Sequence, residues 1–403
     1  MVQVFPVVMP ALTAGHVTHG GMPDMAIAQP EAAVRHDLIE RMNEARRRSD
    51  ALFAVVHAHA LYDRPIPERH RIVFYIGHLE AFDWNLLHGV LPGLKSFHPD
   101  FGRLFAFGID PVNGGLPDDQ PSDWPALERV RDYLTGIRSA LDAKLDHEGS
   151  FDRTRDGFSL DTLLNVAIEH RLMHVETLAY MLHQLPLDRK VRHETSADSV
   201  TAPVAHKMID IPSGAVMLGL RRDSGSFGWD NEFEAHEADV PAFAIDQYKV
   251  TNRQYLEFVN AGGYEARELW SNDDWKWKSE QGISHPIFWK RAGETWQFRG
   301  MFDEGPLPPD WPVYVSHAEA GAFARWVGKS LPTEGEWQRA AHGAGQNGGG
   351  HGAQRLHYSP AIELAEPGVG NFDFARWNPA PVNAHPRGQS AFGVQDLLGN
   401  GWE

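Results

Sequence analysis

At 403 residues the chain is long enough for two domains. Its formal charge of −17 argues against a nucleic-acid partner, whose phosphates would be repelled. The absence of cysteine excludes disulfides, thiolate metal sites and cysteine nucleophiles. No apolar run approaches the roughly 20 residues that a membrane helix needs. We therefore expect a soluble cytoplasmic protein without a membrane segment.

The first 30 residues predict a flexible arm. They open with an apolar stretch that carries no Lys or Arg and contains Pro6 and Pro10, which is a poor signal peptide. From residue 31 to residue 185 the periodicity is helical, with apolar residues spaced at threes and fours. Four helices are expected, over about 31–56, 69–91, 123–145 and 159–185, the last capped by Ser159 or Asp161. Four such helices predict an all-α bundle.

The pattern changes after a polar linker at residues 186–206. Residues 207–403 are rich in Gly, Pro and Trp, with short strand-like runs and short helices. They predict a loop-rich α+β domain. Two stretches, 263–312 and 343–390, show no regular pattern, and loops of that length are usually functional.

Two histidines in the fourth helix, His170 and His174, lie four residues apart and therefore on one face. Glu176 follows about 200° round the helix and points away from them. A third ligand is expected from the second helix, where His78 follows a glycine among apolar residues. Three neutral imidazoles leave positions open for water, O2 or substrate, as in a catalytic metal site. Glu80, two residues after His78, and Glu176 are expected to orient ligand imidazoles across the bundle without binding the metal themselves. Spacing alone leaves a second interpretation open, in which these histidines bind no metal and only form hydrogen bonds in the core. A chain with 22 histidines easily contains such a pair by chance.

The residues around these histidines resemble a known family. The H-x3-H-x-E run at residues 170–176, with "GH" on an upstream helix, resembles the DinB-like domain of the sulfoxide synthases, non-haem iron enzymes of ergothioneine and ovothiol biosynthesis. The second half is similar to the formylglycine-generating-enzyme-type domain. The similarity covers the runs "IPSGAVMLG", "PVYVSHAEAGAFARWVGKSLPTEGEWQRAA" and "GNFDFARWNPAPVNAHPRGQSAFGVQDLLGNGWE". Two unrelated domain types in this order make the resemblance specific.

The resemblance implies a mechanism and a fold. It implies that His78, His170 and His174 hold Fe(II), which activates O2 and joins a sulfur or selenium donor to the imidazole ring of hercynine. The second domain is implied to have a C-type-lectin-like fold. The substrates are then small molecules; the sequence does not indicate an oligomeric state. An active-site tyrosine and part of the donor pocket are expected after Glu403, and no other catalytic residue is assigned.

The branch of the family is expected from local context. "RHRIVFYIGH" followed by "FAFGIDPVNG" resembles the ovothiol-type and selenoneine-type branches more than the ergothioneine-type branch. Ovothiol synthases usually carry a fused methyltransferase, which these 403 residues do not accommodate beside the two domains, so the expectation is the selenoneine-type branch, which joins hercynine to a selenosugar. The alternative is an ergothioneine-type synthase that uses cysteine or γ-glutamylcysteine. Two other classes stay open: a lectin-like binding module, and a DinB-type hydrolase or thiol transferase that uses Zn or Ni.

Four further residues are weaker substrate-binding candidates. Asp83 and Asn85 are placed to reach a bound imidazole from the second helix. Arg129 and Arg131, on the third, are candidates for binding carboxylates of the donor, because arginines near this place do so in similar proteins.

Overall fold

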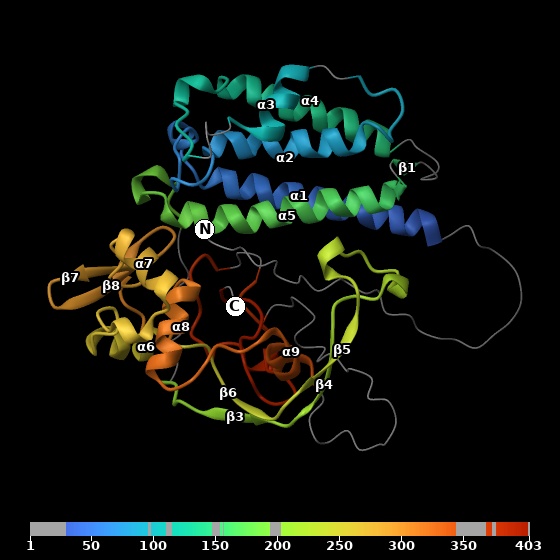
Figure 1. Cartoon of the computed structure of the whole chain (residues 1–403). Helices are drawn as coiled ribbons and strands as arrows, with labels where there is room; N and C mark the ends of the chain where they lie inside the picture. Colours follow the sequence, from blue (N-terminus) through green and yellow to red (C-terminus); the bar gives the residue numbers. More distant parts are fainter. Residues whose placement is uncertain are drawn as a thin grey trace, which may run out of the picture. The chain divides into compact units, whose positions relative to one another are not determined.

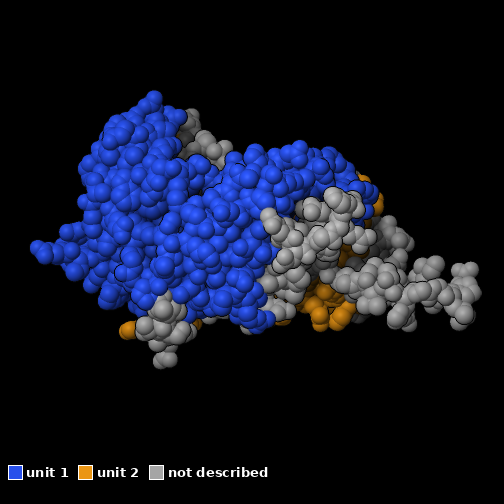
Figure 2. Space-filling model, turned by 90° about the horizontal axis from the view of Figure 1, so that it is seen from below, with its two compact units in different colours: residues 1–14, 194–403 blue, residues 15–193 orange. Residues whose placement is uncertain are grey.

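The computed structural model describes residues 30–95, 98–109, 115–146, 154–155, 157–193, 203–343, 368–372 and 376–401. The chain divides into two compact units, coloured separately in Figure 2. We number them in chain order. Among the described residues, the first unit runs from Pro30 to His193 (orange, labelled unit 2 in Figure 2), and the second runs from Pro203 to Gly401 (blue, labelled unit 1). In the described part of the chain, no helix is both long and apolar enough to cross a membrane.

The first unit is the predicted helical bundle. Its long helices are α1 (Pro30–Ala54), α2 (Ile72–Leu87), α4 (Leu127–Leu145) and α5 (Leu160–Gln184). Helix α1 packs along α5, and α2 packs against α4 and α5 (Figure 1). Ser159 caps α5 by accepting a 3.2 Å hydrogen bond from the Thr162 amide, as predicted. A two-stranded ribbon of β1 (Thr154–Arg155) and β2 (Phe158–Ser159) leads into α5.

One helix in this unit was not predicted from the sequence. Helix α3 (Pro99–Phe107) lies in what the sequence suggested was a connection, and it packs on α2 (Figure 1). Pro99 stands at the first helical position, and His98 accepts a hydrogen bond from the Phe101 amide. Phe101 and Phe105 are the buried residues of this short helix. With nine residues it is too short for periodicity to reveal.

The second unit combines short strands with short helices. Antiparallel pairs are formed by β3 (Met208–Ile211) with β6 (Phe243–Asp246) and by β4 (Gly214–Leu218) with β5 (His236–Val240). A three-stranded sheet holds β7 (Trp289–Ala292), β8 (Thr295–Arg299) and β9 (Glu304–Pro306). The helices are α6 (Asn252–Asn260), α7 (Asn272–Glu280), α8 (His317–Trp326) and α9 (Glu334–His342). This is the α+β, loop-rich domain that the sequence predicts.

The prediction that residues 263–312 are irregular is wrong. Helix α7 and the β7–β8–β9 sheet lie within them (Figure 1). The helix has no buried residue and therefore no apolar stripe to read, and the strands are only three to five residues long. Most of the other stretch, 343–390, lies outside the described residues.

Aromatic side chains build the core of the second unit. The buried cluster consists of Tyr255, Phe258, Tyr264, Trp270, Phe288, Trp289, Phe298, Ala322 and Phe323. The Tyr264 hydroxyl donates a 2.5 Å hydrogen bond to the buried Glu319 carboxylate. Burial raises the pKa of Glu319, and the hydrogen bonds from Tyr264 and Ser316 act in the opposite direction. Glu319 therefore serves the core as a hydrogen-bonding residue. Trp275, Trp296, Trp311 and Trp326 pack against this cluster, so six of the 13 Trp residues of the chain serve packing here.

The "GN" of the closing sequence run ties distant segments together. Asn400 adopts a positive φ of 58°, which asparagine tolerates better than most residues. Its side chain accepts from the Ala380 amide at 2.7 Å and donates to the Ala380 carbonyl and to Asp396, each at 2.9 Å. The segment that ends the described chain is thus fixed to residues about 20 positions earlier.

Candidate metal centre

Three histidine side chains converge inside the helical bundle. Helix α2 carries His78, and two successive turns of α5 carry His170 and His174. One ring nitrogen from each lies within 4.8 Å of the others. The ring centroids are 4.5 Å apart for His170 and His174, 4.9 Å for His78 and His174, and 5.2 Å for His78 and His170. These separations allow all three rings to reach one ion after small rotations.

A backbone carbonyl of α3 fixes the tautomer of His78. The Nδ1 atom lies 2.7 Å from the Phe105 oxygen, which can only accept, so Nδ1–H donates and Nε2 keeps its lone pair for a metal. Gly77 makes this contact possible, because a Cβ there would overlap the Phe105 ring. The "GH" pair in the sequence therefore has a packing reason: glycine admits α3, and α3 orients the imidazole.

The other two histidines are held by packing. Their Nδ1 atoms are buried and, within the described part of the chain, have no hydrogen-bond partner. The Phe82 ring stacks on His170 at a centroid distance of 3.5 Å and an angle of 9°. The Tyr75 ring lies 5.7 Å from that of His174, at an angle of 56°. Because the buried Nδ1 atoms of these two histidines form no hydrogen bonds, the Phe82 and Tyr75 rings on α2 restrict the planes of the imidazoles by packing. On His78, Phe74 adds a stacked ring at 4.7 Å and 26°.

Burial keeps all three imidazoles neutral. It lowers the pKa of His78 and, helped by the neighbouring imidazoles, lowers that of His170 to about 2 and of His174 to about 3. Neutral imidazole is the form that binds a metal. Three neutral nitrogen donors without a carboxylate, two of them with an unpartnered buried nitrogen, fit a divalent transition metal such as Fe(II).

Glu80 belongs to a buried ion-pair network beside the site. Its Oε1 atom accepts from Arg138 at 2.8 and 3.0 Å and lies 3.0 Å from Arg171 Nη2. Arg171 also pairs with Asp83 at 2.5 Å, and its side chain is fully buried. Arg138 reaches Asp50 on α1. The network joins α1, α2, α4 and α5 next to His78 and His170. Because Glu80 is engaged by arginines, His78 is oriented by the Phe105 carbonyl and not by Glu80.

The remaining sequence candidates are spread over the unit. Asp83 is fully buried against Arg171, whereas Asn85, Arg129 and Arg131 are exposed. Arg129 lies 3.3 Å from His98 Nε2 and over the Phe101 ring. Glu176 is half-buried on α5. The structure therefore brings together the three histidines and leaves the other candidates apart from one another, except that Asp83 and Glu80 share Arg171.

Sequence reasoning missed four contributors to the site: Phe74, Phe82, Phe105 and Arg171. The signal for Arg171 was present in the sequence, because Ile168 and Val175, three residues before it and four after it, place this charged residue on the apolar stripe of α5. The aromatic residues follow the spacing of ordinary core positions, and nothing in their pattern distinguishes a ring that stacks on a ligand from one that fills space.

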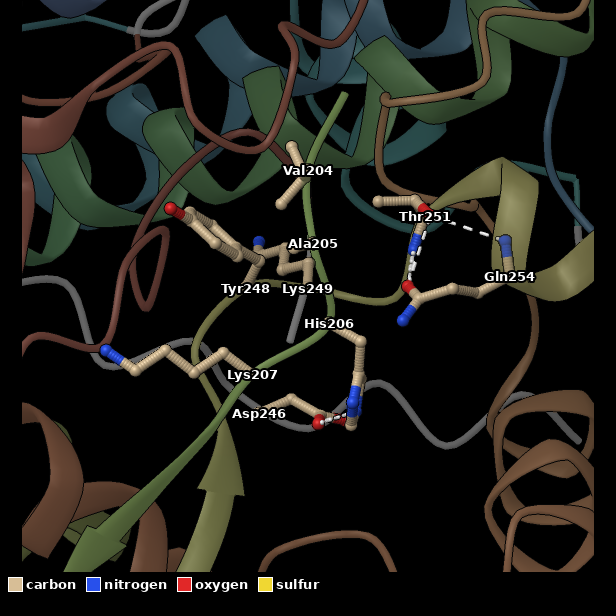
Figure 3. Close-up of a pocket in the computed structure, with 9 residues that line it drawn as sticks. All are labelled: Val204, Ala205, His206, Lys207, Asp246, Tyr248, Lys249, Thr251 and Gln254. Carbon is tan, nitrogen blue, oxygen red and sulfur yellow. Dashed lines mark hydrogen bonds and ion pairs between the residues drawn. The ribbon is translucent and has the colours of Figure 1, made fainter. Parts of the chain in front are cut away.

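A small pocket lies in the second unit. It has a volume of about 20 Å³ and is lined by Val204, Ala205, His206, Lys207, Asp246, Tyr248, Lys249, Thr251 and Gln254 (Figure 3). His206 and Asp246 pair at 2.7 Å on its wall, and Thr251 bonds with Gln254 as a helix cap. A volume near that of one water molecule is too small for an organic substrate. This pocket therefore offers no organic-substrate site, and the histidine centre, with its converging ring nitrogens, is the candidate site.

Comparison with known proteins identifies both parts of the chain. The model of the Sulfatase-modifying factor enzyme 1-like domain matches residues 194–403, and that of the DinB superfamily matches residues 41–178. The chain is 32% identical over 276 residues to a protein named hercynine oxygenase from Mycolicibacterium thermoresistibile, which covers 68% of this chain and 58% of the relative. It is 37% identical over 315 residues to the hercynine oxygenase of Mycolicibacterium smegmatis, with 77% and 68% covered.

A fungal protein shows the same similarity at lower identity. The ergothioneine biosynthesis protein 1 of Neurospora crassa is 26% identical over 306 residues, which covers 68% of this chain and 34% of that protein. The chain thus spans less than two thirds of the length of the M. thermoresistibile relative. All three similarities extend over more than half of this chain.

Proposed function

Because the chain belongs to the ergothioneine-type sulfoxide synthase family, we propose that it joins a sulfur or selenium donor to the imidazole ring of hercynine, using iron and O2. The observation that carries this proposal is the convergence of His78, His170 and His174. Relatives named for hercynine and for ergothioneine biosynthesis support hercynine as the acceptor.

The three histidines would hold the iron through one nitrogen each. Bound Fe(II) would supply the activation of O2 and a coordination position for the chalcogen of the donor. The protein keeps its ligands neutral by burying them, so the ligand set carries no charge of its own. The full charge of the ion is therefore available to attract an anionic thiolate or selenolate. The Phe105 carbonyl holds the proton of His78 on Nδ1.

The proposed reaction balances in atoms and electrons. An imidazole C–H and a thiol S–H give up their hydrogens, a C–S bond forms, and the sulfur gains one oxygen. The bond formation and the sulfur oxidation each release two electrons, and O2 takes up all four. One of its oxygen atoms ends in the sulfoxide and the other in water with the two protons.

The donor is proposed to be either a sulfur compound or a selenium compound. The name ergothioneine biosynthesis protein 1 favours a sulfur donor, for which cysteine and γ-glutamylcysteine are the candidates of the ergothioneine-type alternative. The local sequence "RHRIVFYIGH", which resembles the ovothiol-type and selenoneine-type branches, favours a selenosugar as the other candidate. The two differ chemically: a cysteine-derived donor carries a carboxylate, and a selenosugar carries none.

A competition reaction tests the proposal. The chain, loaded with Fe(II), is given hercynine, O2, cysteine, γ-glutamylcysteine and a selenosugar together, and the products are identified by mass spectrometry. A hercynine–sulfur sulfoxide or a hercynine–selenium adduct supports the reaction and names the donor. Iron binding without any adduct contradicts it.

The histidine assignment is tested separately. His78→Ala, His170→Ala and His174→Ala should each lose bound iron, measured by metal analysis after gel filtration. His88→Ala is the control, because His88 is an exposed residue one turn beyond Trp84 on the end of α2. Retention of iron and activity in any of the three variants would show that the histidine is not a ligand.

A further inference from the structure

Arg69 differs from the other arginines of the helical bundle. Most of those whose side chains are described form ion pairs with a carboxylate: Arg41, Arg46, Arg47, Arg48, Arg64, Arg71, Arg103, Arg138, Arg171 and Arg189. Within the described part of the chain, Arg69 is half-buried and makes no such pair, whereas Arg129, Arg131 and Arg192, which also make none, are exposed. A half-buried guanidinium is normally neutralised by an acid.

The surroundings of Arg69 place it beside the histidine centre. Its Nη2 atom donates a 3.3 Å hydrogen bond to the Tyr180 hydroxyl, on the same helix as His170 and His174. Tyr75, on α2, has its ring 5.7 Å from the His174 ring. Three contacts follow one another along the antiparallel packing of the α2 segment on α5: Arg69 with Tyr180, Tyr75 with His174, and His78 with His170. The guanidinium of Arg69 therefore lies on the same helix–helix contact as the histidine centre, next in line after Tyr75 and His174.

The charge balance around the site calls for an anion at this position. The three imidazoles are neutral, and the nearby carboxylates Glu80 and Asp83 are already paired with Arg171 and Arg138. Arg69 adds a positive charge that forms no ion pair with a carboxylate among the described residues. A guanidinium offers a fork of N–H donors that matches a carboxylate, and the Tyr180 hydroxyl stands next to it.

We propose that Arg69, together with the Tyr180 hydroxyl, binds the carboxylate of an amino-acid-derived substrate and directs it toward the histidine centre. The inference rests on the proposed function, in which hercynine and a cysteine-derived donor both carry such a group. It assigns to the first unit a binding residue that lies nine positions before His78 and outside the matched histidine pattern.

Ligand pairs that differ only in the carboxylate test the assignment. Binding to the Fe(II)-loaded chain is measured by calorimetry under argon, so that no turnover occurs. One pair is hercynine and its decarboxylated analogue, the trimethylammonium derivative of histamine; the other is cysteine and cysteamine. In Arg69→Gln, the carboxylate-bearing member of one pair should bind roughly 10- to 100-fold more weakly, as expected for a lost charge-assisted hydrogen bond. Its decarboxylated partner should bind as before.

The pair that responds identifies the source of the carboxylate. Arg69→Lys should recover part of the lost affinity, because it keeps the charge without the fork. Iron content, measured in each variant, confirms that the site has folded. Arg47→Gln is the matched control, since Arg47 is exposed on α1 and pairs with Glu44.

Two results would overturn the assignment. One is an Arg69→Gln variant that holds iron and discriminates between the members of both pairs as strongly as the unmodified chain. The other is an unmodified chain that binds neither carboxylate ligand. A chain that uses Arg69 to select carboxylates but forms no product would leave the assignment in place and contradict the proposed function instead.

Discussion

Replacing Arg171 by Met should destabilise the helical bundle severely. The Arg171 side chain is fully buried and pairs with Asp83 at 2.5 Å and with Glu80 at 3.0 Å. Glu80 keeps Arg138 in the variant, but Asp83 loses its ion-pair partner among the described residues. Removing one member of a buried pair costs about 3–5 kcal/mol, because the other charge is left without compensation.

The loss should also depend on pH in a defined direction. Burial raises the pKa of Asp83 to about 6 even with Arg171 present. A raised pKa in the folded state means that stability is present below the unfolded pKa of about 4 and is lost as pH rises to the folded pKa. In the unmodified chain this loss is complete near pH 6. In Arg171→Met the pKa of Asp83 rises further, so stability should keep falling between pH 6 and 8, by up to about 1.4 kcal/mol per pH unit.

Hydrogen exchange of peptides from α2 and α5 measures the stability of the helical bundle alone, without interference from the second unit. Compared with the unmodified chain at the same pH, amides that exchange by global opening should exchange roughly 150- to 5,000-fold faster. The double variant Arg171→Met with Asp83→Leu should recover most of the stability and lose the pH dependence, because an apolar pair replaces an unpaired charge. Arg47→Met, which breaks the exposed pair with Glu44, should cost less than about 1 kcal/mol.

The reasoning is refuted if Arg171→Met lies within about 1 kcal/mol of the unmodified chain. It is also refuted if the difference between them stays constant from pH 6 to 8.

Two further predictions concern the packing of α2. Gly77→Ala should destabilise the bundle by about 1–3 kcal/mol through overlap with the Phe105 ring and weaken iron binding roughly 10- to 100-fold by displacing the carbonyl that orients His78. Equilibrium unfolding and metal titration measure both effects. Gly102→Ala on α3, where a Cβ has room 3.8 Å from the Tyr133 hydroxyl, is the control and should not destabilise. Asp119→Asn should cost about 2–3 kcal/mol at pH 7, because Asp119 accepts from Arg71 at 2.8 Å and from Trp124 at 2.7 Å and also pairs with Arg64. Burial raises the pKa of Asp119, but the hydrogen bonds from Trp124 and Arg64 outweigh it and leave the pKa lowered. The stability it contributes is therefore present above pH 4 and lost as pH falls, so the difference between Asp119→Asn and the unmodified chain in urea unfolding should shrink below pH 4; a constant difference would contradict this account.

The sequence determined the helical bundle and the pair of histidines on α5. Apolar spacing at threes and fours is a local property, and it predicted the four long helices with the Ser159 cap. The same geometry placed His170 and His174 on one face. Short elements escaped this reasoning, because α3, α7 and the strands of the β7–β8–β9 sheet are too short or too exposed to show a period.

Only the tertiary structure decided how the site is built. That His78 meets His170 and His174, that Phe105 rather than Glu80 orients its ring, and that Arg69 bonds to Tyr180 without an acid among the described residues all depend on how α2, α3 and α5 pack. These are contacts between residues up to 111 positions apart, the separation of Arg69 and Tyr180. Periodicity reports which face of a helix is buried, but it does not report which side chain of another helix lies opposite, because that is set by the fit of one packed surface against the next.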